Sequence, residues 1–156
     1  MNGDGMSRPN QTGFTYLAAL FLIIVMGIML AAIGKMWGTA QQREKERELL
    51  FVGNQFRQAI GLYYQHSPGG QKTFPLHLED LLLDSRQMGV QRYLRKIYRD
   101  PMTGQAEWAV VVVNDRITGV YSMSQETPLK SSNFRLADKA FENGEKYWDW
   151  KFVYTP

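Results

Sequence analysis

Few residues in this chain have the types and spacing that chemistry requires. His66 and His77 are the only histidines, and they lack the helical spacing of known zinc-binding motifs. The neighbouring acids Glu79 and Asp80, like Asp100, are explained by loop capping or by a solvated helix face. Cysteine is absent, which excludes disulfides, thiolate ligands and cysteine nucleophiles. Because the sequence also has no nucleophile elbow, phosphate-binding loop or dinucleotide-binding turn, we expect no enzymatic activity, no metal and no cofactor.

The overall charge does not indicate a nucleic acid partner. The 156 residues include 18 Lys and Arg against 15 Asp and Glu, which gives a net charge of +3. Nucleic-acid-binding domains carry a larger excess of cations, gathered on one face. The unusual feature is the distribution of the charges, since none occurs between Arg8 and Lys35.

Residues 16–33 within this uncharged stretch are apolar on every side of a helix. A helix of about 20 such residues spans the hydrocarbon core of a bilayer, so we expect a transmembrane helix over residues 14–36. A cleaved secretory signal fits less well, because the stretch is too long and lacks a small-residue cleavage site. The flanking charges do not decide the orientation, whereas translation from Met6 would favour a cytoplasmic N-terminus.

Helix-favouring residues continue beyond Lys35, and apolar residues then recur at three- and four-residue steps. This stripe consists of Leu49, Val52, Phe56, Ala59, Ile60 and Tyr63. We expect one helix over 14–66, in which 37–66 leaves the membrane and 49–66 packs on a globular domain. Two helices broken near 34–39 are the alternative. Residues 43–48 alternate in charge, which predicts a solvated helix face or a surface that touches the next subunit.

Residues 67–156 are expected to form the globular part. The breaker cluster Ser67–Thr73 ends the long helix, and short helical turns follow around 78–82 and 136–141. β-Branched and aromatic runs predict strands at 107–113, 117–122 and 148–154, the first two joined as an antiparallel hairpin. Together these elements predict an α+β fold, with one long helix on a small antiparallel meander. Trp108, Trp148 and Trp150 are expected to pack in its core and on its sheet, although an exposed one could anchor an interface.

The N-terminal block Gly13-Phe14-Thr15-Tyr16-Leu17 joins a short polar leader to the apolar helix. In this arrangement the chain resembles the type IV pilin superfamily. The resemblance implies a leader peptide over 1–13, cleavage after Gly13 by a prepilin peptidase, and N-methylation of Phe14. The family usually has a glutamate as the fifth mature residue, which pairs with a neighbour's terminal amine during assembly. Ala18 occupies that position here.

Two further elements resemble the connecting segment of the G-type pseudopilins of type II secretion. They are the Phe-Pro…Leu-Glu-Asp-Leu motif of 74–81 and the Tyr-Leu…Asp-Pro motif of 93–101. Members of that group often bind calcium in the loop before the C-terminus. Residues 122–133 of this chain offer one carboxylate, Glu126, whereas calcium takes six to eight oxygen ligands, so we expect no calcium site.

The resemblance implies a pilin-like fold and a structural role. The chain would be a pseudopilin-like subunit of a type II secretion-type periplasmic filament. Its partners would be other pseudopilins, the prepilin peptidase, an inner-membrane assembly platform and membrane lipid. It would cross the bacterial inner membrane once, with the C-terminal domain in the periplasm. A minor type IV or competence pilin is an alternative, and a non-polymerising, membrane-anchored periplasmic adaptor is an alternative of another class.

Overall fold

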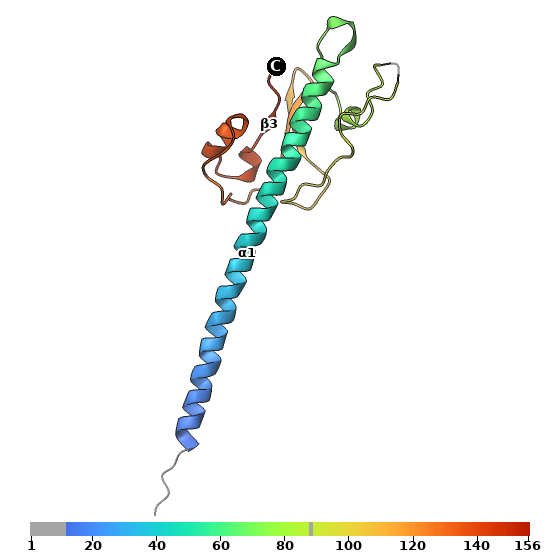
Figure 1. Cartoon of the computed structure of the whole chain (residues 1–156). Helices are drawn as coiled ribbons and strands as arrows, with labels where there is room; N and C mark the ends of the chain where they lie inside the picture. The colour runs from blue at the N-terminus through green and yellow to red at the C-terminus, as the bar shows by residue number, and fades with distance from the viewer. Residues whose placement is uncertain (1–11, 88) are drawn as a thin grey trace, which may run out of the picture. The chain divides into compact units, whose positions relative to one another are not determined.

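The computed structural model describes residues 12–87 and 89–156, and the chain divides into two compact units at Gln41/Gln42. A single α-helix, α1 (Thr12–Gln65), contributes to both units (Figure 1). It has 54 residues and no break between 34 and 39, as the one-helix prediction requires. Because α1 is long and apolar enough to cross a membrane, the expected spanning helix is supported by its length and composition.

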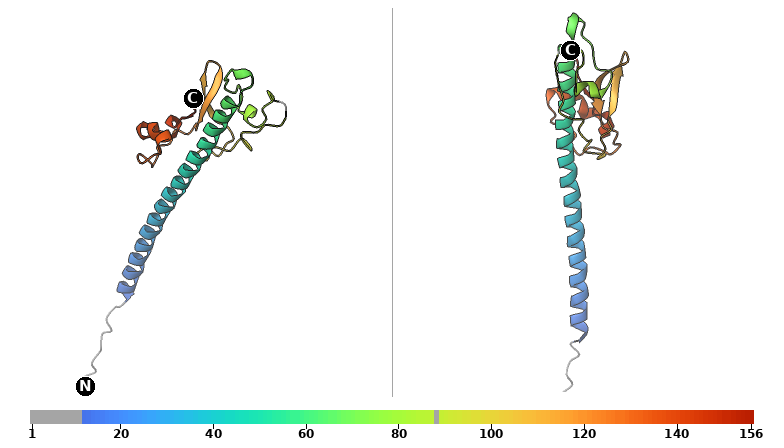
Figure 2. Two further views of the ribbon diagram at one scale, coloured as in Figure 1. Left: turned by 45° about the horizontal axis from the view of Figure 1, so that its top comes forward. Right: turned by 90° about the vertical axis from the view of Figure 1, so that its right-hand side faces the viewer.

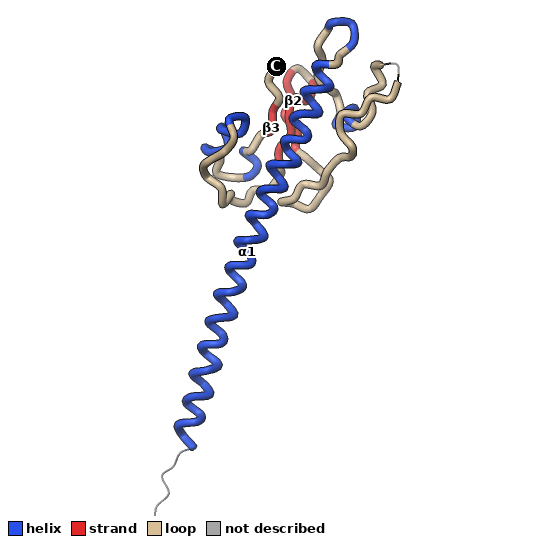
Figure 3. The backbone as a smooth tube through the Cα atoms, in the orientation of Figure 1, coloured by secondary structure: helices blue, strands red, loops and turns tan. Residues whose placement is uncertain are grey.

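The second unit, Gln42–Pro156, is the globular unit, and α1 supplies its central core element. The six residues of the predicted apolar stripe are all buried: Leu49, Val52, Phe56, Ala59, Ile60 and Tyr63. In Figure 1 the segments with η3 (Leu136–Asn143) and η4 (Tyr147–Asp149) flank this part of α1 on one side, and η2 (Leu78–Leu81) lies on the other. Much of the unit is loop, as the tan tube of Figure 3 shows.

A three-stranded antiparallel sheet packs against α1 in the order β1-β2-β3. The predicted hairpin consists of β1 (Ala109–Val113) and β2 (Arg116–Tyr121). Asn114 and Asp115 connect the strands with φ of 51° and 60°, the left-handed values of a tight two-residue turn. A bulge between Val111 and Val112 shifts the register, and the third strand pairs with β2. Figure 2 shows the hairpin in orange beside α1.

The prediction of a third strand over 148–154 is wrong in extent. Only β3 (Phe152–Val153) pairs with β2, and the preceding residues form the 3₁₀ helix η4. The Asp149 carboxylate accepts hydrogen bonds from the Glu145 and Lys146 amides at 3.1 and 3.0 Å, which favours the turn over an extended strand. Trp150 and Phe152 are nevertheless both fully buried, so the alternation in the sequence predicted the burial of these two side chains correctly, whereas Trp148 at its start is exposed.

Close packing between α1 and β3 depends on a glycine. A Cβ atom built on Gly53 would lie 2.4 Å from the ring of Phe152, which is itself buried against Phe141. The glycine therefore lets the ring approach the helix backbone. The buried ion pair of Arg57 with Asp138, at 2.7 Å, fastens η3 to the same part of α1.

Candidate functional site

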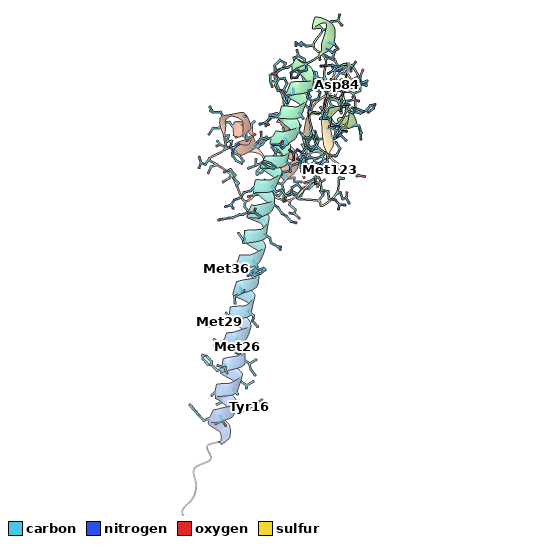
Figure 4. The ribbon with its side chains drawn as sticks, turned by 45° about the vertical axis from the view of Figure 1, so that its right-hand side comes forward. Tyr16, Met26, Met29, Met36, Asp84 and Met123 are labelled. Atoms are coloured by element: carbon cyan, nitrogen blue, oxygen red, sulfur yellow. The ribbon has the colours of Figure 1, made fainter. Side chains whose placement is uncertain are left out.

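The first part of α1 is the candidate functional element, because its apolar side chains are exposed. Of the described side chains from Phe14 to Ile33, all are exposed except that of Val25, which is half-buried. Figure 4 labels Tyr16, Met26 and Met29 along this part of the helix. An uncharged helix with apolar groups on every side needs an apolar medium or neighbouring helices around it.

The expected processing residues lie at the start of this helix. Gly13 and Phe14 both fall in the first turn of α1, which begins at Thr12. The Phe14 side chain is 78% exposed, and Ala18 is exposed one turn later. The rest of the expected leader, residues 1–11, lies outside the described residues. The structure thus places the three site residues on adjacent turns of one helix.

The two histidines lie in different segments of the chain. His66 lies just beyond the C-terminus of α1, where Nδ1 is 2.9 Å from the Leu62 carbonyl oxygen, and His77 precedes η2. Among the described residues, no group of three or more His, Cys, Asp or Glu side chains could hold a metal ion.

Of the three acids singled out in the sequence, Asp80 and Asp100 cap loops and Glu79 is exposed, in agreement with the two explanations expected for them. The Asp80 carboxylate accepts hydrogen bonds from the His77 and Leu76 amides at the start of η2, at 2.9 and 3.0 Å. Asp100 is fully buried and accepts hydrogen bonds from the Met102 amide at 2.9 Å and from the Ser122 hydroxyl at 2.6 Å. Asp100 therefore joins the turn that precedes β1 to the end of β2.

The prediction of a solvated face over 43–48 is wrong for one residue, Glu46, which is only 4% exposed. Its Oε1 accepts hydrogen bonds from the Leu129 and Lys130 amides at 2.6 and 3.1 Å and from the Tyr147 hydroxyl at 2.9 Å. These hydrogen bonds hold the long loop after β2 against α1, and they offset the free-energy cost of burying the carboxylate. Glu46 lies three residues before Leu49 on the buried stripe, and this spacing was the available signal in the sequence.

The rest of 43–48 agrees with the prediction of a solvated face. Arg47 and Glu44 are exposed and form an ion pair at 3.3 Å across one helical turn. Beside Glu46, burial raises the pKa of the Tyr147 hydroxyl to about 12, and the hydrogen bond it donates to the carboxylate acts in the same direction.

A second network, missed in the sequence, closes the C-terminus of α1. The Arg86 guanidinium donates both Nε and Nη2 to the buried Asp84 carboxylate, at 2.8 and 2.7 Å. It also donates to the carbonyl oxygen of Tyr63 and to the hydroxyls of Ser67 and Thr73, each at 3.0 Å. The Tyr63 carbonyl belongs to the last turn of the helix, where backbone acceptors lack intrahelical partners. Arg86 therefore ties the end of α1 to two neighbouring loops.

The electrostatics of this network follow from these contacts. The hydrogen bond from Arg86 lowers the pKa of the Asp84 carboxyl below its usual value, against the opposing effect of burial. Burial raises the pKa of the hydroxyls of Tyr63 and Tyr93, and the hydrogen bond that Tyr93 donates to Asp84 raises its own further. These pKa shifts therefore favour the charged forms of Asp84 and Arg86 and the neutral forms of the two tyrosines.

Of the predicted core tryptophans, Trp108 and Trp150 are buried, whereas Trp148 is about half exposed and contacts Tyr121 edge-to-face.

Comparison with known proteins does not identify a family for this chain. No family model matches the chain, and neither a curated protein nor a solved structure matches it.

Proposed function

We propose that this chain is a pseudopilin-like structural subunit of a type II secretion-type periplasmic filament. The observation that carries the proposal is the difference between the two parts of α1. Its first part is uncharged and exposed around the helix, and its second part buries one stripe in a small α+β unit. An element of this kind can anchor a subunit in a bilayer and then pack against the same helix of neighbouring copies.

The junction at the start of α1 supports processing. Glycine is the least favourable residue after proline in a helix interior, and the first turn of a helix is the first to fray. The Gly13–Phe14 bond can therefore become extended at small cost, as a peptidase requires. Cleavage there by a prepilin peptidase would leave Phe14 as the first residue and Ala18 as the fifth. The globular unit would then face the periplasm, and an inner-membrane platform would add the subunit to the filament.

Cysteine crosslinking in membranes tests the assembly, since the chain has no cysteine of its own. Ala18→Cys with Leu20→Cys places two thiols on opposite sides of α1, because two residues turn a helix by about 200°. A subunit with neighbours on several sides is expected to give a ladder of trimers and larger products on oxidation. The single variant Ala18→Cys is the matched control and can give only dimers.

The outcomes separate the proposed function from the adaptor. A non-polymerising anchored adaptor would give no products beyond the dimer from the two-cysteine variant, and this result would overturn the proposal. Ala18→Glu examines the departure from the family pattern. It is tested in a chain with the two cysteines at Leu20→Cys and Leu22→Cys, which leaves position 18 free and again places the thiols on opposite sides of α1. If the missing carboxylate contact is all that weakens assembly, Ala18→Glu is expected to lengthen the ladder of this chain.

A further inference from the structure

A basic cavity lies where α1 enters the globular unit. It has a volume of about 340 Å³ and is lined by three cations, a carboxylate, two hydroxyl groups and two leucines. These are Arg43, Arg47, Lys130, Glu46, Ser131, Ser132, Leu50 and Leu129. One side of the cavity comes from the first two turns of α1 within the globular unit, and the other comes from the loop that Glu46 holds in place.

Two of the three cations are available to a ligand. Arg47 already pairs with Glu44 at 3.3 Å, whereas within the described part of the chain neither Arg43 nor Lys130 forms an ion pair. The Lys130 ammonium lies 4.9 Å from the centre of the Phe134 ring, which limits its freedom. The one carboxylate, Glu46, is turned toward two amides and a hydroxyl, so that protein dipoles offset its charge.

The chain itself keeps this cavity close to the apolar segment. Trp37, the residue directly after the expected transmembrane segment 14–36, lies six positions before Arg43. A chain of six residues reaches at most about 20 Å when fully extended, whatever the angle between the two units. If the apolar segment spans a bilayer, the Trp37 ring is suited to the headgroup level, and the cavity lies within reach of lipid phosphates.

We propose that this cavity binds the phosphodiester headgroup of an anionic membrane lipid. Arg43 and Lys130 would neutralise the phosphate, the hydroxyls of Ser131 and Ser132 would donate hydrogen bonds to its oxygens, and the leucines would contact the glycerol and upper acyl carbons. This inference rests on the proposed membrane anchoring and adds a lipid preference to it. A membrane-bound headgroup is favoured over a soluble anion because anchoring raises its effective concentration at the cavity.

The test compares lipid retention by the full chain and two charge-matched variants. Each protein is reconstituted into vesicles of equal parts phosphatidylglycerol and phosphatidylcholine, extracted in detergent, and analysed by native mass spectrometry for bound lipid. Arg43→Gln with Lys130→Gln is expected to reduce the preference for phosphatidylglycerol by about fivefold for each cation removed. Arg92→Gln with Arg95→Gln removes the same charge from exposed residues of a different cavity and should leave the preference unchanged.

Further controls keep the result interpretable. Arg43→Lys with Lys130→Arg retains both charges and is expected to retain the preference, and near-ultraviolet circular dichroism checks that each variant is folded. An equal loss in both glutamine variants, or no loss in either, would overturn the proposal. So would binding of inorganic phosphate with no preference for phosphatidylglycerol, or a change in crosslinking between copies with lipid retention unaffected.

Failure here is distinct from failure of the proposed function. The crosslinking ladder and the N-terminal residue of the same variants report subunit assembly and processing directly. If both remain as in the unaltered chain while the lipid preference is absent, only the headgroup site is refuted.

Discussion

Replacing Glu46 by alanine is expected to lower the free energy of unfolding of the globular unit by about 3 kcal/mol. The carboxylate accepts three hydrogen bonds, from the Leu129 and Lys130 amides and from the Tyr147 hydroxyl. Bonds to a charged group are worth about 1.5–3 kcal/mol each, but water can replace the carboxylate at the two part-buried amides. The buried hydroxyl of Tyr147 has less access to water and accounts for much of the loss.

Glu46→Gln removes the negative charge of the side chain but keeps an oxygen that can accept hydrogen bonds. The amide oxygen can still accept hydrogen bonds, so we expect a loss of about 1–2 kcal/mol. Glu48→Ala is the matched control, because Glu48 lies on the exposed face of the same helical turn and its replacement should cost less than about 0.5 kcal/mol. Both alanine variants gain the same helix propensity.

The measurement is urea denaturation of the full chain in detergent micelles, followed by near-ultraviolet circular dichroism. A midpoint for Glu46→Ala that is no lower than that of Glu48→Ala would refute the reasoning. The loop after β2 would then be held by its apolar contacts, and the Glu46 hydrogen bonds would add nothing to stability.

Three other substitutions test the packing and the titrating groups. Gly53→Val should lower the thermal midpoint by forcing the buried Phe152 ring aside, at a cost of about 1–3 kcal/mol, whereas Gly38→Val has open space and should not. The depressed pKa of Asp84 contributes stability above about pH 4 that is lost on acidification. In a plot of the free energy of unfolding against pH, Asp84→Asn should therefore make the acid limb flatter. The raised pKa of Tyr147 contributes stability below about pH 10 that is lost toward pH 12, and Tyr147→Phe should remove this alkaline loss. An unchanged limb in either variant would contradict the corresponding assignment.

Local patterns in the sequence were enough to predict most elements of the globular unit. The three- and four-residue spacing from Leu49 to Tyr63 identifies a buried helix face, because that spacing alone puts the side chains on one side. The valine-rich run before Asn114 and Asp115 predicts the hairpin, since both strand preference and turn preference are local. These predictions needed no knowledge of which segments meet.

The parts that were missed depend on contacts between distant segments. Glu46 has the composition of a solvated helix face, and its burial follows from bonds to amides 83 and 84 residues away. The Asp84–Arg86 pair gains its role only when Ser67 and Thr73 are folded beside it. The last strand was overestimated because alternation reports which side chains are buried and not which backbone groups pair.

The central claim is tested most directly by the N-terminal residue of the chain extracted from its native membrane. Intact mass and N-terminal sequencing are expected to give N-methylated Phe14 as the first residue. Gly13→Leu should block this cleavage, whereas Gly27→Leu, with open space around it in the same helix, should leave it unaffected. A chain that begins at Met1 or Met6 would contradict the account and would favour a membrane-anchored adaptor.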